Sequence, residues 1–447
     1  MPINVIGAGL AGCEAAWQIA SRGIKVRLFE MKPSKKSPAH SMNTFSELVC
    51  SNSLKASRLA SAAGMLKQEM RMLGSLLMDC ADKCTVPAGG ALAVDREIFS
   101  QLVTKRIRQN ENIEIISEEV TSLDFDDITV VATGPLTSES LSECIKAMFG
   151  GALSFFDAAA PIVTKESVDM SSAFSASRYG KGDDDYINCP MNKEEFERFE
   201  QELINAERAP LHDFDVANPK VYEGCMPIEI MAQRGKDAIR FGPMKPVGLI
   251  DPKTGHRPWA VLQLRRENAA GTLYNLVGFQ TNLKFSEQRR VFSMIPALKK
   301  ADFVRYGVMH RNTFIDSPRL LNSDYSSRQN PRLFFAGQLT GVEGYMESAS
   351  SGLIAGINAS RLYSGMQTLT LPEFTMIGSL SRYITDPTVT KFQPMGANLG
   401  ILPLLEEKIR DKRERAEKYS ERSFISLEIF MSEYDLNKIG ENDEDNY

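Results

Sequence analysis

Two cysteines lie in contexts where a thiol could act as a nucleophile. Cys225 falls in residues 222–227, a turn flanked by Gly and Pro that would expose its side chain, and Glu229 follows as a nearby base. Cys50 precedes residues 51–53, a Ser-Asn-Ser cluster that we expect to cap a following helix. Because a helix N-terminus lowers the pKa of a thiol, Cys50 is as good a candidate as Cys225. The residues alone do not separate the two.

The remaining thiols are expected to be structural. We interpret Cys13, Cys80, Cys84 and Cys144 as small buried hydrophobes and leave Cys189 undecided. Seven cysteines spread over 447 residues do not have the spacing of a secreted disulfide framework, so we expect a reducing, cytoplasmic compartment. With only four histidines in the chain, ligands are too few near the cysteines, and we expect no metal.

The first thirty residues have the pattern of a dinucleotide-binding unit. A β-prone run at residues 3–6 leads into a G-x-G-x-x-G loop, a helical stretch to Ala20 and a second strand at residues 25–29, which ends at Glu30. The loop consists of Gly7, Ala8, Gly9, Leu10, Ala11 and Gly12. Its glycines permit a tight turn, a close approach to a pyrophosphate and close helix packing. Glu30 would accept the ribose hydroxyls, which favours FAD or NAD over NADP.

Two later segments favour FAD. The run at residues 128–135 reads as a buried strand that ends in Thr133-Gly134, a turn that flavoproteins of the glutathione-reductase type carry near the dinucleotide. A second buried strand, at residues 333–336, leads to a loop and a helix of small residues at 348–359. The candidate flavin contacts there are Gly337, Gln338, Glu343, Gly344 and Tyr345. We therefore predict an α/β protein, a glutathione-reductase-type FAD-binding Rossmann fold with an inserted α+β substrate domain.

The order of these segments suggests a division of the chain. We expect the first part of the FAD-binding domain at residues 1–150, the inserted substrate domain at 151–310 and the second FAD-binding part at 311–375. A C-terminal helical segment with a frayed acidic tail should occupy 376–447. Apolar spacing at residues 59–77 predicts one amphipathic helix. No apolar stretch of about 18 residues occurs, so no membrane contact is expected.

Charge is distributed unevenly along the chain. The whole chain carries a formal net charge of -5, which by itself argues against nucleic acid as a partner. Residues 231–310, however, contain 14 Lys and Arg against 5 Asp and Glu, with aromatic residues among them. Cations bind phosphates and aromatic rings stack on unpaired bases, so this part of the insertion predicts an RNA-binding face. Its candidate cations are the pairs Arg265-Arg266 and Arg289-Arg290.

Longer strings resemble a known family over nearly the whole chain. They occur at residues 47–55 (ELVCSNSLK), 86–92 (VPAGGAL), 188–191 (NCPM), 223–229 (EGCMPIE), 240–249 (RFGPMKPVGL), 274–281 (YNLVGFQT), 307–313 (GVMHRNT) and 392–395 (FQPM). On these strings the sequence is similar to the folate- and FAD-dependent tRNA (uracil-5-)-methyltransferases, small relatives of glucose-inhibited division protein A. It departs from the family at Asn282, where His is frequent, and at Gly396, where Asn is frequent.

The resemblance implies a reductive methylation. 5,10-Methylenetetrahydrofolate gives a one-carbon unit to C5 of the T-loop uridine at position 54 of tRNA, reduced FAD supplies the electrons, and NADH or NADPH regenerates the flavin. A thiolate that adds to C6 of uracil makes C5 nucleophilic. The resemblance assigns this role to Cys225 and places Cys50 beside the isoalloxazine. It implies tRNA and folate as partners, and we expect a monomer.

Other functions are compatible with parts of the sequence. The same chemistry could act on a ribosomal RNA uridine, or the protein could be an FAD oxidoreductase that needs no RNA. A wobble-modifying enzyme would need the long C-terminal helical extension that this chain lacks. A non-catalytic FAD-dependent assembly factor would tolerate the loss of Cys225.

Overall fold

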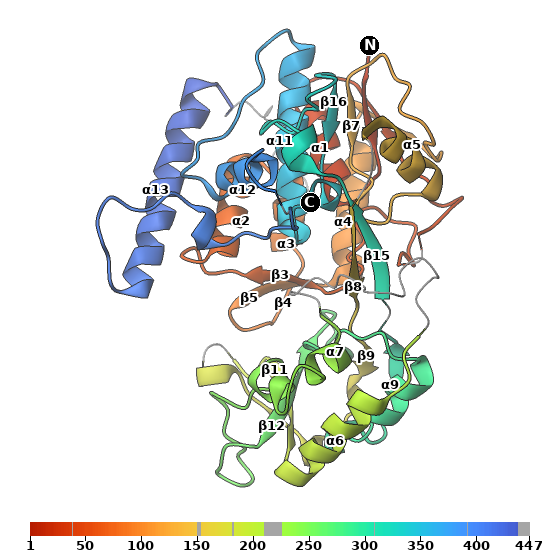
Figure 1. The fold of residues 1–447 in the computed structure, drawn as a ribbon, viewed down its shortest axis with the longest axis vertical. Helices are drawn as coiled ribbons and strands as arrows, with labels where there is room; N and C mark the ends of the chain where they lie inside the picture. The colour runs from red at the N-terminus through yellow and green to blue at the C-terminus, as the bar shows by residue number, and fades with distance from the viewer. Residues whose placement is uncertain are drawn as a thin grey trace.

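The computed structural model describes residues 1–37, 39–149, 153–180, 183–209, 226–307, 309–390 and 392–436. Figure 1 shows two lobes, one above the other in that view. The parallel-sheet lobe contains both termini of the described chain, and the insert lobe is formed by residues 162–305. The antiparallel pair β8 (Leu153–Ala158) and β15 (Met309–Phe314) leads from one lobe to the other and back.

A five-stranded parallel sheet forms the centre of the parallel-sheet lobe. Its order is β16 (Leu333–Phe335), β7 (Thr129–Val131), β1 (Ile3–Ile6), β2 (Val26–Phe29) and β6 (Ile113–Ile116), with every neighbouring pair parallel. β1 and β7 are fully buried, as expected of parallel strands that are covered on both faces. This arrangement confirms the predicted α/β fold class, and the loops after β1, β7 and β16 emerge at one edge of the sheet.

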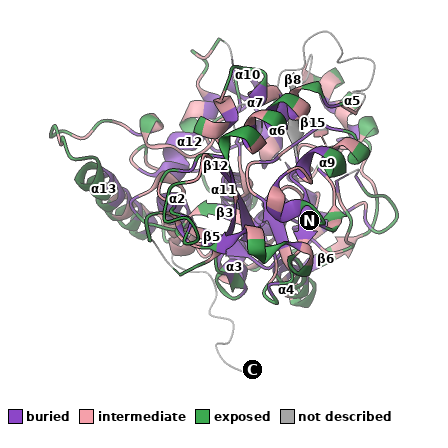
Figure 2. Cartoon of the chain, turned by 90° about the horizontal axis from the view of Figure 1, so that it is seen from below, coloured by how far each residue is buried: buried purple, intermediate pink, exposed green. Residues whose placement is uncertain are grey.

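Helices and a small sheet surround this centre. The helices are α1 (Leu10–Ala20), α2 (Ala62–Met72), α3 (Leu76–Asp82), α4 (Arg96–Gln109), α5 (Glu139–Phe149), α10 (Ser317–Leu320), α11 (Tyr345–Tyr363), α12 (Met376–Thr385) and α13 (Lys412–Glu433). The small sheet has the order β3 (Ser53–Ala56), β5 (Ala91–Val94) and β4 (Thr85–Val86). It lies on the side of the lobe that faces the insert lobe (Figure 1). α13 is largely exposed at the edge of the molecule (Figure 2).

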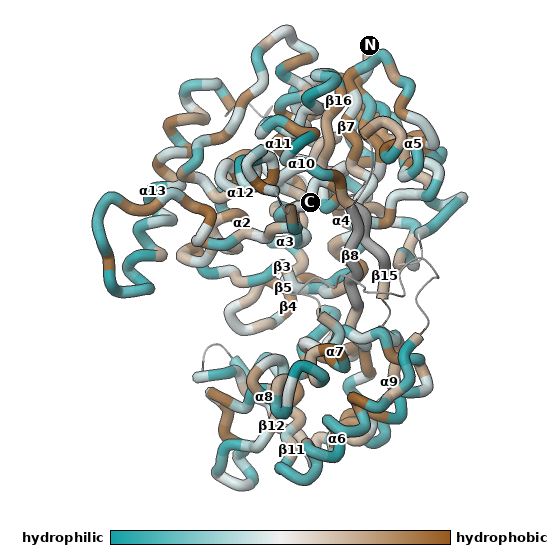
Figure 3. Tube along the Cα trace, in the orientation of Figure 1, coloured by the Kyte–Doolittle hydropathy of each residue, from teal (hydrophilic) through white to brown (hydrophobic). Residues whose placement is uncertain are grey.

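The insert lobe has its own sheet and its own core. The six strands run in the order β10 (Phe174–Ser175), β11 (Tyr186–Met191), β12 (Ala260–Arg266), β13 (Leu273–Leu276), β9 (Ile162–Thr164) and β14 (Phe303–Arg305). α6 (Lys193–Asn205), α7 (Ile228–Ala232), α8 (Ala238–Phe241) and α9 (Phe285–Phe292) accompany it. α6 buries Phe196, Phe199 and Leu203 against this core. Hydrophilic and hydrophobic residues accordingly alternate around the helices of this lobe in Figure 3.

The single helix predicted at residues 59–77 is wrong. The structure has two helices there, because Gly74 adopts a positive φ of 71° and Ser75 then caps α3. α2 is capped by Ser61, whose hydroxyl accepts a hydrogen bond from the Gly64 amide at 3.1 Å. Leu59, which the periodic pattern placed on the buried stripe, is 49% exposed. Gly74, in the left-handed region, ends α2, although the apolar spacing that predicted one helix continues past this residue.

Two buried glutamates tie these helices together. Glu14 on α1 accepts hydrogen bonds from the Leu76 and Leu77 amides at the start of α3. Glu69 on α2 accepts hydrogen bonds from the Met376 and Ile377 amides at the start of α12, at 2.7 and 2.8 Å. Each carboxyl group thus satisfies orphan donors of another helix. Burial raises the pKa of both carboxyl groups to about 7. Among the described residues, no helix is long and apolar enough to cross a membrane.

Three glycines let backbones touch where α1 packs. Gly12 faces the carbonyl oxygen of Gly7, and Gly352 on α11 faces the carbonyl oxygen of Ala11, so closely that a Cβ would overlap either oxygen. A Cβ on Gly356 would lie 2.7 Å from the oxygen of Ala15. Only glycine allows helices to approach in this way. The contact joins the late helix α11 to the first helix of the chain.

We expect Gly352→Ala to lower the free energy of unfolding by roughly 1–3 kcal/mol, because the added methyl group forces α1 and α11 apart. Chemical denaturation followed by circular dichroism measures this change. Gly90→Ala is the matched control, since a Cβ there meets nothing within 4 Å. Equal stability of the two variants would contradict the close contact.

Candidate functional site

The first glycine loop has the geometry of a phosphate cradle. Gly7 donates a hydrogen bond to the oxygen of Phe29 at 2.7 Å and has a positive φ of 98°, which makes the turn from β1 to α1. Gly9 is the N-cap of α1, and a Cβ on it would meet nothing within 4 Å. The amides at the start of α1 therefore open onto free space, where a negatively charged group is favoured.

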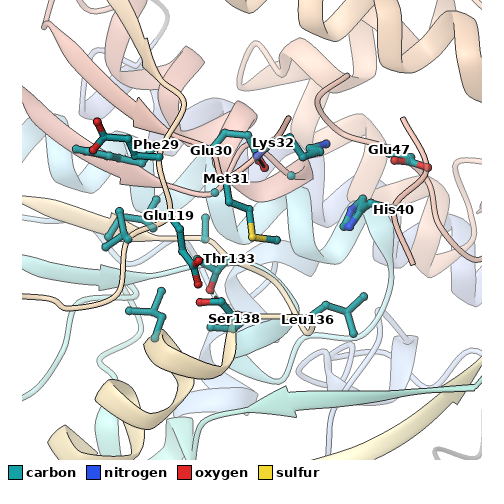
Figure 4. Close-up of a pocket in the computed structure, with 18 of the residues that line it drawn as sticks. Phe29, Glu30, Met31, Lys32, His40, Glu47, Glu119, Thr133, Leu136 and Ser138 are labelled. Atoms are coloured by element: carbon teal, nitrogen blue, oxygen red, sulfur yellow. Dashed lines mark hydrogen bonds between the residues drawn. The ribbon is translucent and has the colours of Figure 1, made fainter. Parts of the chain in front are cut away.

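Glu30 lies at this loop, as the sequence predicted. Its carboxylate accepts hydrogen bonds from the amides of Ala8 at 2.9 Å and Lys32 at 3.0 Å. Gly7, Gly9, Glu30 and Thr133 line one cavity, which Figure 4 shows with Glu30, Met31 and Thr133 around it. The structure thus brings together three sequence-predicted segments that lie up to 126 positions apart.

Further residues of the cavity were missed by sequence reasoning. They are Lys32, His40 and Glu47 on one side and Glu119 and Ser138 on the other. The Glu47 carboxylate accepts hydrogen bonds from two amides of the 41–42 turn, and burial lowers the pKa of His40. Glu47 opens the string at 47–55, but no motif carries the other positions, because the loops from residues 31–47 and 118–138 come together only in the fold.

The late flavin segment lies beside the first loop. Ala336 donates to the oxygen of Val131, so the end of β16 lies next to the end of β7. Gly337 follows with a positive φ of 79°, and its amide donates to the Ser351 hydroxyl of α11 at 2.7 Å. A Cβ on Gly337 would lie 3.1 Å from the Ala11 methyl group. The two predicted dinucleotide-binding segments, the 7–12 loop and the turn at Gly337, therefore lie next to each other.

The loop that follows is fixed at several points. The Gln338 amide group donates to the Glu343 carboxylate at 2.8 Å, and the Glu343 amide donates to the oxygen of Met395 at 2.8 Å. Gly344, with a positive φ of 126°, leads into Tyr345 at the start of α11. A Cβ on Gly396 would lie 3.0 Å from the oxygen of Glu343. The departure from the family at this position therefore lies directly behind the flavin loop.

Tyr345 connects this loop to Cys50. Its hydroxyl oxygen accepts hydrogen bonds from the amides of Cys50 at 2.7 Å and Ser51 at 3.1 Å. Burial raises the pKa of Tyr345, which keeps the phenol neutral at ordinary pH. Cys50 itself is half-buried. Two of the sequence-predicted site residues, 295 positions apart, are in direct contact.

The Ser-Asn-Ser cluster after Cys50 does not cap a helix, because α2 begins later, after the cap residue Ser61. Residues 53–56 form β3, and Ser51 and Asn52 are not helix caps. The argument that a helix N-terminus lowers the pKa of the Cys50 thiol is therefore wrong. The Asn52 side chain instead bridges the two lobes: its amide group donates to the oxygens of Val94 on β5 and Arg266 on β12, both at 3.0 Å.

Arginines of the insert lobe hold the Cys50 loop. Arg265 on β12 donates to the Ser51 hydroxyl at 2.7 Å and to the Asn52 side-chain oxygen at 3.1 Å. Arg305, at the end of β14, donates to the oxygen of Val49. Arg96 and Glu267 form a buried ion pair between the lobes. Sequence reasoning named Arg265 only as a phosphate contact and did not single out Arg305 or Arg96.

These contacts correct the predicted RNA face. Arg265 is only 8% exposed and its guanidinium is used within the protein, so it is not a free cation for phosphate. Arg290 forms ion pairs with Glu202 and Glu287. Arg289 is exposed as well, and Arg266 is half-buried.

Cys225 lies outside the described residues, but the flanks of its segment are described. The Ala209 amide donates to the oxygen of Asn282 at 2.7 Å, and the Asn282 side chain donates back to the oxygen of Ala209 at 3.1 Å. Glu229 accepts hydrogen bonds from the Thr281 hydroxyl and the Asn282 amide, and it is fully buried. The Glu229 carboxylate therefore holds residues 281–282 in place, and this buried position does not suit a base that acts on the substrate. Asn282, the second departure from the family, joins both flanks.

The other cysteines have structural surroundings. Cys13, Cys80, Cys84 and Cys189 are buried, whereas Cys144, which was also expected to be buried, is half-buried. Burial raises the pKa of the Cys13, Cys80 and Cys84 thiols to about 12 and raises that of Cys189 as well. None of these four thiols is suited to act as a thiolate near neutral pH. Among the described residues, no group of three or more His, Cys, Asp or Glu could hold a metal ion.

Comparisons with known proteins agree with this geometry. A family model described as "Glucose inhibited division protein A" matches residues 2–367. A relative from Acetivibrio thermocellus, named methylenetetrahydrofolate--tRNA-(uracil-5-)-methyltransferase TrmFO, is 61% identical over 97% of this chain and 99% of its own length. A relative from Lactiplantibacillus plantarum with the same name is 58% identical over 96% of this chain and 97% of its own length.

Solved structures show the same fold at lower identity. GidA from Aquifex aeolicus in its form II crystal matches with a TM-score of 0.71 at 18% identity, over 98% of this chain and 75% of that chain. The form I crystal gives a TM-score of 0.70 over 98% of this chain and 78% of that chain. At this identity the likeness describes the fold.

We expect Tyr345→Phe to leave the Cys50 and Ser51 amides without their acceptor, at a cost of about 1–3 kcal/mol. The loop should open, and Cys50 should react several-fold faster with iodoacetamide. Peptide mapping by mass spectrometry measures the alkylation of this one thiol. Tyr363→Phe, an exposed tyrosine at the end of α11, is the control. An unchanged alkylation rate would mean that the hydroxyl does not hold the loop.

Proposed function

Because this chain belongs to the family of glucose inhibited division protein A, and within it to the methylenetetrahydrofolate–tRNA-(uracil-5-)-methyltransferases, we propose that it methylates C5 of the T-loop uridine at position 54 of tRNA. It is an enzyme of folate-dependent tRNA methylation. The observation that carries the finer proposal is the meeting of the Cys50 loop with the late flavin loop through Tyr345.

The residues fit FAD as the resident cofactor. Gly9 leaves space in front of the first turn of α1, and Glu30 stands at the end of β2 where ribose hydroxyls need an acceptor. We infer that the 7–12 loop holds the pyrophosphate, while Thr133-Gly134 and the 337–345 loop hold the rest of the dinucleotide. When bound and reduced, FAD supplies the electrons that turn a methylene into a methyl group.

Two cysteines are given different roles. We infer that the Cys225 thiolate adds to C6 of the target uracil, which makes C5 nucleophilic toward the folate one-carbon unit. The role proposed for Cys50 is to border the flavin ring. The Tyr345 hydroxyl accepts a hydrogen bond from the Cys50 amide and so positions this loop beside the 337–345 loop.

The remaining reactants follow from the chemistry. 5,10-Methylenetetrahydrofolate is the one-carbon donor, and NADH or NADPH is proposed as the reductant that regenerates the flavin. The relatives are tRNA-modifying enzymes by name, so we infer that the protein acts in the cytoplasm.

The function is tested by methylation of an unmodified tRNA transcript. FAD-loaded enzyme with NADH or NADPH and labelled 5,10-methylenetetrahydrofolate should put label on the T-loop uridine. Labelled S-adenosylmethionine should give none. Ribosomal RNA from a strain without the modification is the competing substrate, and labelling of that RNA alone would overturn the tRNA assignment. NAD(P)H turnover that ignores RNA and transfers no label would indicate a plain oxidoreductase.

We expect Cys225→Ala to lower methyl transfer by roughly a thousandfold or more, because the C6 nucleophile is lost. The same variant should form no covalent adduct with 5-fluorouridine RNA on a denaturing gel. The absorption spectrum of its bound FAD should equal that of the wild type. Cys189→Ala, which removes a fully buried thiol, is the control. An adduct of full yield in Cys225→Ala would refute the assignment.

A further inference from the structure

Three aromatic rings of the insert lobe form a parallel stack that ends at the surface. Phe303 on β14 and Tyr306 have ring centroids 5.7 Å apart with an interplanar angle of 10°. Tyr306 and Phe285, the first residue of α9, have centroids 4.9 Å apart with an angle of 16°. Phe303 packs against the core of the lobe, whereas Phe285 is 54% exposed. We name these three residues the ring stack.

Another apolar side chain could also cover Tyr306, so packing alone does not explain why the residue at position 285 is aromatic. The inner face of Phe285 covers Tyr306, and its exposure leaves the opposite side of the ring to solvent. Stacking a further flat ring on this side would continue the series of parallel planes. Unpaired nucleobases bind proteins in this way, since every base has a π-face.

The ring stack has described neighbours on two sides, the Cys50 loop and the chain just before the Cys225 segment. Tyr306 directly follows Arg305, whose guanidinium donates to the oxygen of Val49, next to Cys50. On its other side, the Lys284 amide, just before Phe285, donates to the oxygen of Glu207 at 3.0 Å. The segment that leads to Cys225 begins three residues later. Phe285 therefore lies beside Glu207, in the described chain just before the segment that carries Cys225.

The surroundings carry the charge that a polyanion needs. Residues 284–306 contain six Lys and Arg against two Asp and Glu. Glu287 is neutralised by Arg290, and Glu207 by Lys284. Arg289 is exposed and lies four residues after Phe285 on α9, so the two side chains share a helix face. α9 lies in the insert lobe near β9 (Figure 1).

We propose that the exposed face of Phe285 is the stacking site for an unpaired RNA base that flanks the target uridine, with Arg289 as the neighbouring phosphate contact. This inference rests on the proposed function, because it assigns a binding position to the RNA substrate of that same site. The ring stack supplies a rigid platform, and the cations fix the RNA backbone beside it.

The test measures the Kd of FAD-loaded enzyme for an unmodified tRNA transcript at several salt concentrations. Phe285→Leu keeps an apolar contact with Tyr306 but removes the flat ring, and we expect the Kd to rise roughly five- to hundredfold. Phe285→Trp should keep wild-type affinity. The slope of log Kd against log salt should stay unchanged in Phe285→Leu, because stacking releases no counterions. In Arg289→Gln the magnitude of this slope should fall by about one, because one phosphate contact is lost.

Controls separate stacking from loss of structure. Tyr363→Leu changes an aromatic residue that is 45% exposed at the end of α11, and its Kd should equal that of the wild type. The KM for 5,10-methylenetetrahydrofolate and the thermal unfolding of Phe285→Leu should also be unchanged.

Two results would overturn the inference while the proposed function stands. One is wild-type tRNA affinity in Phe285→Leu together with normal methylation by the wild type. The other is a raised KM for folate with unchanged tRNA affinity, which would make the ring stack a pteridine contact. A wild-type holoenzyme that neither binds nor methylates tRNA would instead refute the proposed function, and the inference with it.

Discussion

The direct backbone contact between α1 and α11 is the constraint on which the site depends. Gly352 and Gly356 bring α11 against the carbonyl oxygens of α1, with no side chain between the two helices. α1 carries the phosphate cradle at its start, and α11 carries Tyr345 at its start. The contact therefore sets the distance between the two segments proposed to hold the dinucleotide. A side chain at either glycine would shift one end relative to the other.

A second consequence reaches the insert lobe. Tyr345 holds the amides of Cys50 and Ser51 from the parallel-sheet lobe, and Arg265 holds Ser51 from the insert lobe. The Cys50 loop is thus the shared boundary of two separate hydrophobic cores. Each lobe is built around its own apolar residues. The junction between the lobes is polar, and each buried polar group there needs its own hydrogen-bond partner. The site is complete only when both lobes are in place.

The fold by itself does not decide the reaction. GidA from Aquifex aeolicus shares this fold at 18% identity, and a fold of this kind hosts many chemistries. The insert lobe adds the arginines at the Cys50 loop, the anchored flanks of the Cys225 segment and the ring stack. Those features lie on the lobe that the sequence showed to be locally basic.

The sequence by itself determined the parts that depend on local backbone geometry. The G-x-G-x-x-G loop, Glu30 and the Gly337 turn were predictable because a glycine period and a strand pattern constrain only neighbouring residues. Tertiary structure alone decided what the polar residues do. Ser51 and Asn52 looked like helix caps, yet their partners lie on Arg265, 213 and 214 positions away. Arg265 looked like a phosphate contact, yet the fold buries it. A local pattern cannot show which distant group satisfies a polar side chain, because that choice is made only when the two lobes meet.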